Sequence, residues 1–345
     1  MDLPKSIPDE KTLDELLIRP SPELTGFMKG LEGDIMILGA AGKIGVSLSI
    51  LAARTIQEAG ISKKVIAVDL FSEQTVRESM EQAGVETLQC DLLNRSDVTG
   101  LPDVSNVIYM AGRKFGTGDD QELTWVINVL APDYVANRFR DSKIVVYSTG
   151  CVYPLVRPVD GGCTENTAPS PVGEYAQSCL GRERVFSYYS KNFRTRICLY
   201  RLNYSIDLRY GVLYDIGIKV YRSRPVELAV SHFNCIWQGD ANRMALLSLG
   251  HCGSPPGILN ITGTEMVSVR ETAEKFGRYF DMDVQFTGED TNSTMYLSDA
   301  SKSVQLFGHP EVPADKMIEW QAGWILQGGR SLNKPTHFEI TSGQF

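Results

Sequence analysis

The stretch that most constrains the fold runs from Asp34 to Gly45, with the sequence DIMILGAAGKIG. Ile35–Leu38 is a continuous apolar run of strand length, which is typical of a strand buried on both faces of a parallel sheet. Gly39, Gly42 and Gly45 follow at three-residue spacing, and a helical pattern continues after them. We interpret this as a turn in which one glycine allows a tight bend, one lets the backbone approach a pyrophosphate and one lets the helix pack closely on the strand.

The strand after this helix indicates which dinucleotide the turn would hold. KVIAVD, residues 64–69, is a second apolar strand that ends in Asp69. An acid at that place can accept hydrogen bonds from both hydroxyls of an adenosine ribose, whereas it would repel a 2′-phosphate, so the sequence favours NAD over NADP. The alternative is that Asp69 only caps the next helix. The cofactor candidates from this unit are Gly39, Ala41, Gly42, Lys43, Ile44, Gly45, Asp69 and Leu70.

Composition sets the class of protein and excludes several partners. The chain has 345 residues, 43% hydrophobic and 22% charged, which is ordinary for a globular protein with a large core and two lobes. Its net charge of -8 argues against a nucleic-acid or anionic-membrane surface, and no apolar run is long enough to span a bilayer. The acidic N-terminus lacks a signal-peptide core, so we expect a cytoplasmic location. Seven scattered cysteines without a C-x-x-C pair predict reduced thiols and no metal site.

From residue 34 to about 200, strand and helix patterns alternate, which predicts an α/β fold with a doubly wound parallel sheet of the Rossmann type. We expect its strands at residues 35–38, 65–68, 87–89, 106–110, 144–147 and 196–199. Ligands of such sheets bind at the carboxyl ends of the strands. The candidates at these ends are Asp91 and Leu92 beside the adenine, Ala111 and Gly112 as a passage past the cofactor, and Ser148.

The chain divides into four parts on these patterns. We expect an N-terminal extension over residues 1–32, a NAD-binding Rossmann domain over 33–200 to which 233–250 returns, a smaller mixed α/β substrate lobe from 201–232 and 251–330, and a tail, 331–345, packed on the surface. Beyond residue 200 we expect helices at 210–222, 240–249 and 269–279 and strands at 234–237 and 258–261. The loop 154–173 is expected to contact substrate.

Five segments, taken in order, carry the pattern of one known family. They are GAAGKIG (39–45), YSTGCVY (147–153), YAQSCLGRE (175–183), IWQGDANRMAL (236–246) and ILNITGTEMVSVRETAE (258–274). Together they resemble the extended short-chain dehydrogenase/reductase group, the NAD-dependent epimerase/dehydratase family. The resemblance covers residues 34 to about 328.

The resemblance implies a catalytic pair. Tyr175 would move a proton to or from a substrate carbinol while NAD exchanges the hydride, and the hydroxyl of Thr149 would hold the same oxygen. It also implies cofactor contacts for Asn128, Tyr175 and Cys179. The family's lysine would stand four residues after the tyrosine, where this chain has Cys179.

Without the lysine, another group must stabilise the tyrosine phenolate. A free tyrosine has a pKa of about 10, and lowering this pKa to about 7 takes roughly 4 kcal/mol of phenolate stabilisation. Arg182, one turn beyond Cys179, is our hypothesis for the replacement charge. Cys179 itself is either a thiol that takes part in the chemistry or an inert small residue.

Two more departures bear on the substrate. Where the family's dehydratases have an Asp-Glu pair, this chain has Gly150 and Cys151, which disfavours elimination of water. Phe233 stands where nucleotide-sugar epimerases often carry an arginine, which weakens the nucleotide-sugar interpretation. The substrate candidates are Thr149, Gly150, Cys151, Asn203, Arg209 and His232.

Three functions fit these residues. The first is an NAD-dependent oxidoreductase or epimerase that acts on a secondary hydroxyl or keto group of a sugar or sugar-derived substrate. The second is an NAD-binding protein with little redox turnover, and the third is a lyase or isomerase that uses tightly bound NAD transiently. The resemblance further implies a homodimer, whose apolar face would come from Trp125, Val126, Val129, Leu130, Tyr134, Val185, Phe186 and Tyr189.

Overall fold

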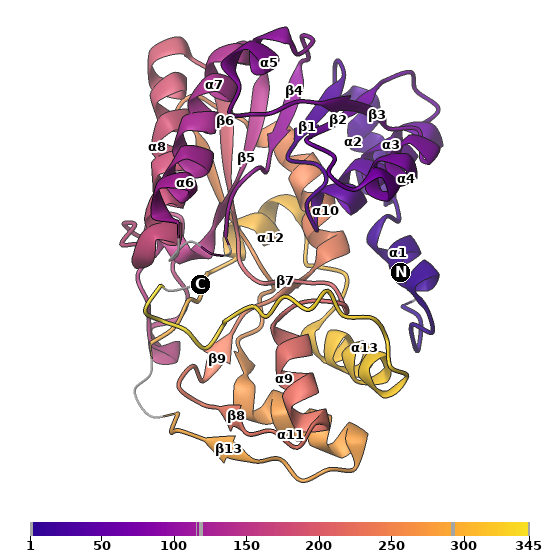
Figure 1. Ribbon diagram of the computed structural model, residues 1–345, viewed down its shortest axis with the longest axis vertical. Helices are drawn as coiled ribbons and strands as arrows, with labels where there is room; N and C mark the ends of the chain where they lie inside the picture. The colour runs from indigo at the N-terminus through magenta and orange to yellow at the C-terminus, as the bar shows by residue number, and fades with distance from the viewer. Residues whose placement is uncertain (1–2, 115, 117–119, 291–293, 344–345) are drawn as a thin grey trace.

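The structure is a computed structural model that describes residues 3–343, apart from residues 115, 117–119 and 291–293. Its centre is a seven-stranded sheet with the order β11-β6-β5-β4-β1-β2-β3, in which all neighbouring strands run parallel (Figure 1). The strands are β1 (Ile35–Leu38), β2 (Val65–Asp69), β3 (Glu86–Gln89), β4 (Asn106–Tyr109), β5 (Lys143–Thr149), β6 (Arg196–Leu202) and β11 (Gly257–Ile261). The predicted doubly wound sheet is therefore confirmed.

The alternation of side chains along β1 explains how the sheet is covered. Ile35 and Ile37 join the core under α3 (Gly45–Ala59) and α10 (Gln238–Leu247), whereas Met36 and Leu38 join the core under α7 (Ala131–Arg138) and α8 (Gly173–Phe193). All four are fully buried, as expected of a central parallel strand. The helices of these two layers are α3 (Gly45–Ala59), α4 (Gln74–Gln82), α5 (Arg95–Gly100), α6 (Gln121–Trp125), the π-helical segment η1 (Val126–Leu130), α7 (Ala131–Arg138), α8 (Gly173–Phe193) and α10 (Gln238–Leu247).

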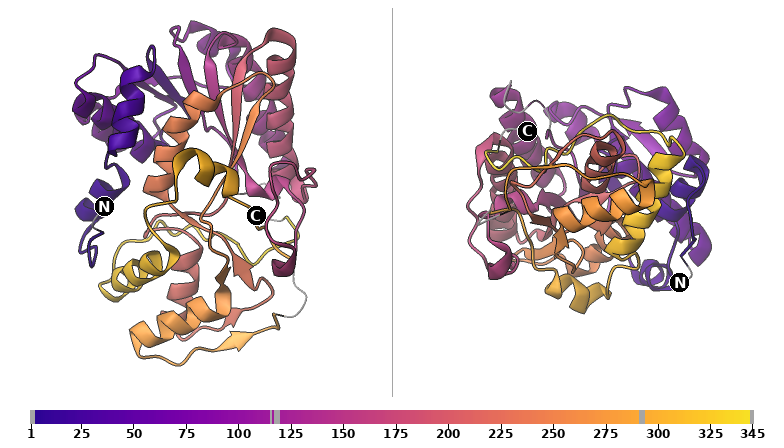
Figure 2. Two further views of the ribbon diagram at one scale, coloured as in Figure 1. Left: turned by 180° about the vertical axis from the view of Figure 1, so that it is seen from behind. Right: turned by 90° about the horizontal axis from the view of Figure 1, so that it is seen from below.

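A small lobe lies beyond the carboxyl ends of the strands (Figure 2). Its helices α9 (Val212–Tyr221), α11 (Val269–Phe280) and α13 (Ala314–Leu326) pack on one another. Three two-stranded sheets complete it or join it to the large domain: β7 (Ser205–Ile206) with β10 (Ile236–Trp237), β9 (His232–Phe233) with β12 (Val267–Ser268), and β8 (Val226–Glu227) with β13 (Phe286–Thr287). Short 3-10 turns are η2 (Gly150–Val152), η3 (Pro158–Asp160) and η4 (Ser248–His251).

The predicted boundary of the small lobe is wrong in one segment. β11 is an edge strand of the main sheet beside β6, although we assigned residues 251–330 to the substrate lobe. Helix α12 (Ser301–Phe307) lies against β11, and Lys302 donates a hydrogen bond to the carbonyl of Ile258 at 2.8 Å. The chain therefore returns to the large domain twice, because a short apolar strand does not reveal which sheet it will join.

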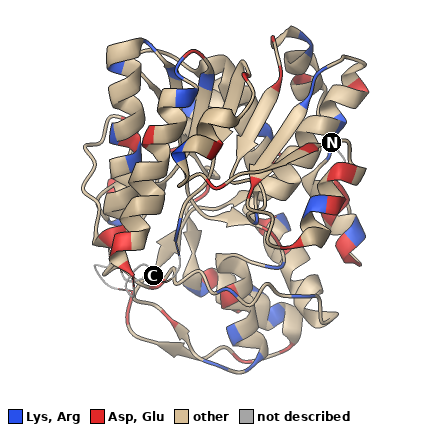
Figure 3. Ribbon diagram, turned by 45° about the horizontal axis from the view of Figure 1, so that its top comes forward, with Lys and Arg blue, Asp and Glu red and all other residues tan. Residues whose placement is uncertain are grey.

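The two ends of the chain are built into the molecule. In the N-terminal arm (residues 3–32), α1 (Glu10–Leu17) packs on α10 and α2 (Pro22–Gly30) packs on α3, with Leu13, Leu24 and Met28 fully buried. Charges of both signs alternate along the arm (Figure 3). The C-terminal strap (residues 330–343) crosses between the large domain and the small lobe (Figure 1). No helix among the described residues is long and apolar enough to cross a membrane.

Candidate functional site

A cavity of about 430 Å³ lies between the carboxyl ends of the central strands and the small lobe. Segments far apart in sequence line it: the glycine turn, the loop after β4, the end of β5, the start of α8, the loop after β6, and the C-terminal strap. Of the predicted site residues, those that line it are Gly39, Gly42, Lys43, Ile44, Gly112, Ser148, Thr149, Cys151, Tyr175 and Asn203. Parallel sheets bind ligands at this edge, so the cavity is the candidate site.

At two of the three glycines in the turn, a side chain would clash with the protein's own backbone. Gly39 has a φ of +84°, and a Cβ there would lie 2.6 Å from the backbone of Ala111 after β4. A Cβ at Gly45 would lie 2.4 Å from the carbonyl oxygen of Ala40. These contacts match the predicted tight bend and the close packing of helix on strand.

Gly42 is different, because the protein leaves room beside it. A Cβ at Gly42 would meet only the carbonyl oxygen of Gly39, at an ordinary 3.5 Å. Gly42 lines the cavity and is exposed, and no side chain caps the N-terminus of α3, which begins three residues later. An open backbone beside an uncapped helix N-terminus suits the pyrophosphate of a dinucleotide.

Asp69 ties the end of β2 to the glycine turn. Its Oδ2 accepts a hydrogen bond from the backbone N–H of Ala41 at 2.9 Å, and its Oδ1 accepts one from Leu70 at 2.7 Å. Asp91, after β3, accepts one from Leu93. These acids and the neighbouring Leu70 and Leu92 do not line the cavity; they lie further along the sheet edge, at the ends of β2 and β3.

The predicted catalytic pair is assembled in the cavity wall. Thr149 ends β5 and Tyr175 lies in the first turn of α8, and both residues line the cavity. Burial raises the pKa of Tyr175 well above its usual value, and the thiols of Cys179 and Cys151 act in the same direction. Arg182 and the Thr149 hydroxyl lower it. The site therefore contains a phenol that holds its proton tightly and one guanidinium that opposes this.

Cys179 lies one turn after Tyr175 on α8 and is buried. It does not line the cavity. Burial raises the pKa of Cys179 to about 11, so its thiol stays protonated at neutral pH. Of our two alternatives, this environment favours the inert residue, because nucleophilic thiols need a lowered pKa.

Arg182 reaches from α8 into the cavity wall. Its Nη1 donates to the carbonyl of Tyr147 at 2.9 Å and its Nη2 donates to Oδ1 of Asn128 at 2.7 Å. A Cβ at Gly112 would lie 2.4 Å from that Nη2, so the glycine leaves space for the guanidinium. Nε of Arg182 is buried without a hydrogen-bond partner. The arrangement holds a fixed positive charge on the same helix as Tyr175.

Asn128, for which we predicted a cofactor contact, lies behind the cavity wall. It lies in the π-helical segment η1, fully buried, and its amide is engaged by Arg182, by Ser178 and by the backbone N–H and carbonyl of Arg113. It does not line the cavity. The side chain therefore links the loop after β4 to α8 and holds Arg182 in place, instead of contacting the cavity directly.

The analysis of the sequence missed a buried ion pair behind the site. Ser148 donates to Oε1 of Glu183 at 2.6 Å, and Glu183 accepts two hydrogen bonds from Arg201 at 2.8 and 2.7 Å. Both charged side chains are 3% exposed. An arginine inside the apolar strand RICLYRL was the available signal, since a buried charge needs a partner.

Comparison with known proteins agrees with this geometry. Residues 35–204 match the model of the NAD dependent epimerase/dehydratase family. These residues place the chain in that family. A search of curated proteins found no match.

Two solved structures with the same fold align with this chain over nearly their whole length. UDP-glucuronic acid 4-epimerase from Bacillus cereus, in complex with UDP-glucuronic acid and NAD, has a TM-score of 0.70 at 19% identity over 85% of this chain and 99% of that chain. UDP-glucose 4-epimerase from Thermus thermophilus, in complex with NAD, has a TM-score of 0.65 at 19% identity over 84% and 97%. At these identities the likeness concerns the fold. Since 99% and 97% of the relatives' chains align but only 85% and 84% of this chain, this family member carries segments that both relatives lack.

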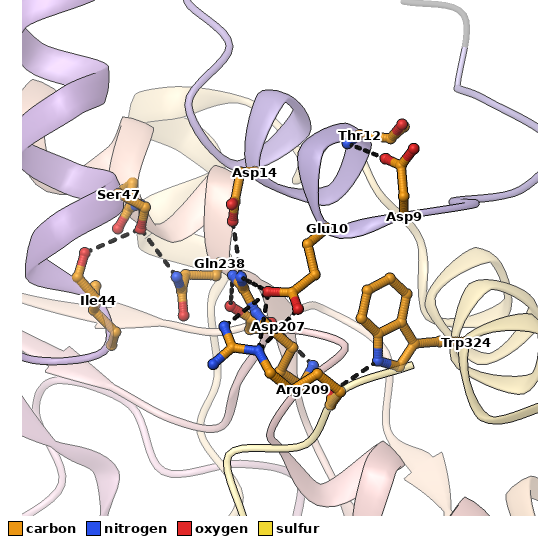
Figure 4. A network of polar contacts seen from close by, with 12 residues as sticks. Asp9, Glu10, Thr12, Asp14, Ile44, Ser47, Asp207, Arg209, Gln238 and Trp324 are labelled. Carbon is orange, nitrogen blue, oxygen red and sulfur yellow. Dashed lines mark hydrogen bonds and ion pairs between the residues drawn. The ribbon is translucent and has the colours of Figure 1, made fainter. Parts of the chain in front are cut away.

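Three of the predicted substrate residues, Gly150, Arg209 and His232, do not line the cavity of this epimerase-family protein. Arg209 forms ion pairs with Asp207 at 2.7 Å, Asp14 at 2.9 Å and Glu10 at 3.4 Å (Figure 4). His232 lies in β9 and its Nδ1 is within 2.9 Å of Oγ of Ser231. Neither Arg209 nor His232 lines this cavity, and a substrate contact for either residue stays a prediction.

The remaining predicted positions behave as supports. Gly150 does not line the cavity but backs Asn203, whose side chain would lie 3.2 Å from a Cβ at Gly150. Ala111 and Gly45 pack against the glycine turn, as described above. Within the described part of the chain, no group of three or more His, Cys, Asp or Glu residues could hold a metal, and all seven cysteines are free thiols.

Proposed function

We propose that this family member is an NAD-dependent epimerase or oxidoreductase that acts on a secondary hydroxyl or keto group of a sugar derivative. The observation that carries the proposal is that Tyr175 and Thr149 both lie in the wall of a cavity that begins at the glycine turn. The two relatives named above, which bind NAD and in one case UDP-glucuronic acid, support a sugar substrate.

The chain's own residues fit NAD. The turn around Gly42 and the uncapped N-terminus of α3 would hold the pyrophosphate, and Asp69 would accept hydrogen bonds from the adenosine ribose. NAD, when bound, supplies a hydride acceptor and a positively charged ring. The protein supplies the groups that bind the substrate oxygen and move its proton.

In this proposal Tyr175 and Thr149 act on the substrate oxygen. Thr149 holds the oxygen by a hydrogen bond, and the phenolate of Tyr175 accepts the hydroxyl proton as the carbinol becomes a carbonyl. In the reverse direction the phenol returns that proton to the oxygen. Arg182 lowers the pKa of Tyr175 and so takes over part of the task of the missing lysine.

Replacement of Tyr175 by phenylalanine tests the proposal. Tyr175→Phe is expected to lower turnover of a sugar substrate by at least about 100-fold, because general acid–base catalysis contributes on the order of 10²–10⁴. Its affinity for NAD in calorimetry should stay near that of the wild type. Tyr188→Phe, a matched change of an exposed tyrosine on the same helix, should have no effect. Full activity in Tyr175→Phe would refute the role of this residue.

One observation favours a second candidate, an NAD-binding protein with little redox turnover. Burial and the thiols of Cys179 and Cys151 hold the pKa of Tyr175 high. Cys179→Lys separates the candidates, because it restores the charge of the family at this position. A large gain in redox rate indicates an impaired centre, whereas a loss indicates that the wild-type mechanism uses the thiol environment.

A further inference from the structure

Tyr204 is a strained residue in the wall of the cavity. It lies between the end of β6 and the start of β7, and its φ is +41°. Of the described non-glycine residues with a positive φ, Tyr204 is the only one that lines the cavity. A left-handed conformation is costly for a bulky residue, and residues that keep one concentrate at functional sites. The cofactor contacts and the proton transfer described above do not use this tyrosine.

The backbone on both sides of Tyr204 is held by hydrogen bonds. The N–H of Asn203 donates to the carbonyl of Ile261, which ends β11 of the large sheet, at 2.9 Å. The carbonyl of Tyr204 accepts a hydrogen bond from the N–H of Ile236, the first residue of β10, at 3.1 Å. Two sheets therefore hold the chain where it passes from β6 to β7, and they fix the conformation of Tyr204.

A turn at this place does not by itself require a tyrosine. Glycine and asparagine adopt a positive φ at lower cost, as Gly308 and Asn333 do outside the cavity lining, with φ values of +73° and +52°. Packing explains part of the choice, because the Tyr204 side chain is partly buried against the main core. Packing does not explain the hydroxyl, which has no hydrogen-bond partner among the described residues.

Tyr204 lies next to the proposed reactive pair. Thr149, the last residue of β5, is the register partner of Leu202, the last residue of β6, and Tyr204 follows two residues later. Thr149, Tyr175 and Tyr204 all line the cavity. Burial raises the pKa of Tyr204 well above its usual value, and the thiol of Cys151 acts in the same direction. The phenol therefore stays protonated at neutral pH, which makes it a hydrogen-bond donor and not a base.

A sugar substrate requires such donors, because its hydroxyls lose their hydrogen bonds to water when it enters a cavity. Gly150, Arg209 and His232, which we predicted to contact substrate, do not line the cavity. In the proposed function Thr149 and Tyr175 act on the oxygen that reacts. The other hydroxyls of the sugar need further partners in the wall.

We propose that the hydroxyl of Tyr204 binds the substrate by donating a hydrogen bond to a sugar hydroxyl other than the one that reacts. This inference rests on the proposed function and adds a substrate-binding residue to it. Tyr204 orients the sugar against Tyr175 and takes no part in proton transfer. Because the backbone already fixes the direction of the phenol, little conformational freedom is lost when the sugar binds.

Calorimetry on the full-length protein saturated with NAD tests the inference, with UDP-glucose, UDP-glucuronic acid and glucose as probes. Tyr204→Phe is expected to weaken sugar binding about tenfold, the size of one hydrogen bond in a cavity. Its affinity for NAD and its unfolding midpoint in urea should match those of the wild type. Tyr296→Phe is the matched control and should leave sugar binding unchanged, because the Tyr296 hydroxyl is buried without a partner and Tyr296 does not line the cavity.

Monodeoxy analogues of the probe that binds most tightly identify the hydroxyl. Titration of each analogue into the wild type and into Tyr204→Phe gives a double-mutant cycle. The analogue that lacks the hydroxyl bound by Tyr204 should bind equally to both proteins, whereas the other analogues keep the tenfold difference.

The inference is overturned if Tyr204→Phe binds the probes as the wild type does. It is also overturned if every monodeoxy analogue shows the same difference between the two proteins, since Tyr204 then contacts no sugar hydroxyl. A parallel loss of NAD affinity in Tyr204→Phe, or a NAD-loaded wild type that binds none of the probes, likewise overturns it.

These outcomes are separable from a failure of the proposed function. If Tyr175→Phe loses activity while Tyr204→Phe binds the sugar normally, the proposed function stands and only this inference falls. If Tyr175→Phe keeps full activity, the proposed function fails, whatever the binding data for Tyr204.

Discussion

Two positions in the cavity wall, Gly112 and Gly42, are occupied by glycine for different physical reasons. At Gly112 the protein occupies the space of a side chain, because Nη2 of Arg182 and Oδ1 of Asn128 would lie 2.4 and 3.1 Å from a Cβ. At Gly42 the space is open to the cavity. A side chain introduced at Gly112 would therefore clash with the protein itself. A side chain introduced at Gly42 would occupy space in the cavity, so its effect reports on ligand binding.

Gly112→Ala is expected to displace Arg182 from Asn128. Overpacking of this kind costs about 1–3 kcal/mol of unfolding free energy, which urea denaturation measures. Because Arg182 lowers the pKa of Tyr175, the rise of turnover with pH should also move to higher pH. Gly26→Ala, in a helix and without a neighbour within 4 Å, is the control and should be neutral or stabilising. An unchanged pH profile in a destabilised Gly112→Ala protein would separate Arg182 from catalysis.

Lys43 lines the cavity, and we expect its charge to make the binding of an anionic probe depend on pH. Its pKa is about 7 in the free protein, so the protonated form that attracts an anion disappears as the pH rises above 7. The affinity for UDP-glucuronic acid should therefore fall between pH 7 and pH 9. Burial also lowers the pKa of Lys114 in the same cavity, so Lys43→Arg should remove the part of this dependence that belongs to Lys43. A constant affinity from pH 6 to pH 9 would contradict this account.

At the scale of elements, the helices beside the site expose an apolar face. Trp125, Val126 and Leu130, on α6 and η1, are 37%, 36% and 42% exposed, and Tyr188 on α8 is 58% exposed. Phe186 and Tyr189, which we predicted for the same face, are buried in the core instead. A face of this kind suits a second copy of the chain.

We therefore expect a homodimer in sedimentation velocity at micromolar concentration. Leu130→Glu should dissociate it, because a carboxylate in an apolar interface is costly to desolvate. Leu326→Glu, at a similarly exposed leucine on α13, should leave it intact. A wild-type monomer under these conditions would refute the predicted dimer.

The sequence predicted the elements well where one local pattern decides. β1 was predicted at its observed bounds, and α9 and α11 within about two residues, because apolar periodicity and flanking glycines are local. The pairing of Thr149 with Tyr175 came from the family pattern. The neighbour of β11, the partners of Arg209 and the position of the C-terminal strap depend on contacts across the whole chain, and local patterns carry no information on these.

At the scale of the molecule, the two ends of the chain hold the small lobe to the large domain. Glu10 in the N-terminal arm contacts Arg330 at the start of the strap and Arg209 in the loop after β6 (Figure 4). The loop continues to Tyr210, whose ring lies under Lys43 of the glycine turn. The N-terminal arm therefore supports the cavity from outside, and the C-terminal strap, which we predicted as a surface tail, forms part of its wall.

The central claim is that the glycine turn holds a dinucleotide. Calorimetric titration of NAD into the wild type and Gly42→Val tests it most directly, because the protein has room for a side chain at this position. We expect about one equivalent of NAD to bind to the wild type, and Gly42→Val to fold normally in circular dichroism while its affinity falls at least about 100-fold. Absence of NAD binding to the wild type, or unchanged binding to Gly42→Val, would contradict the account.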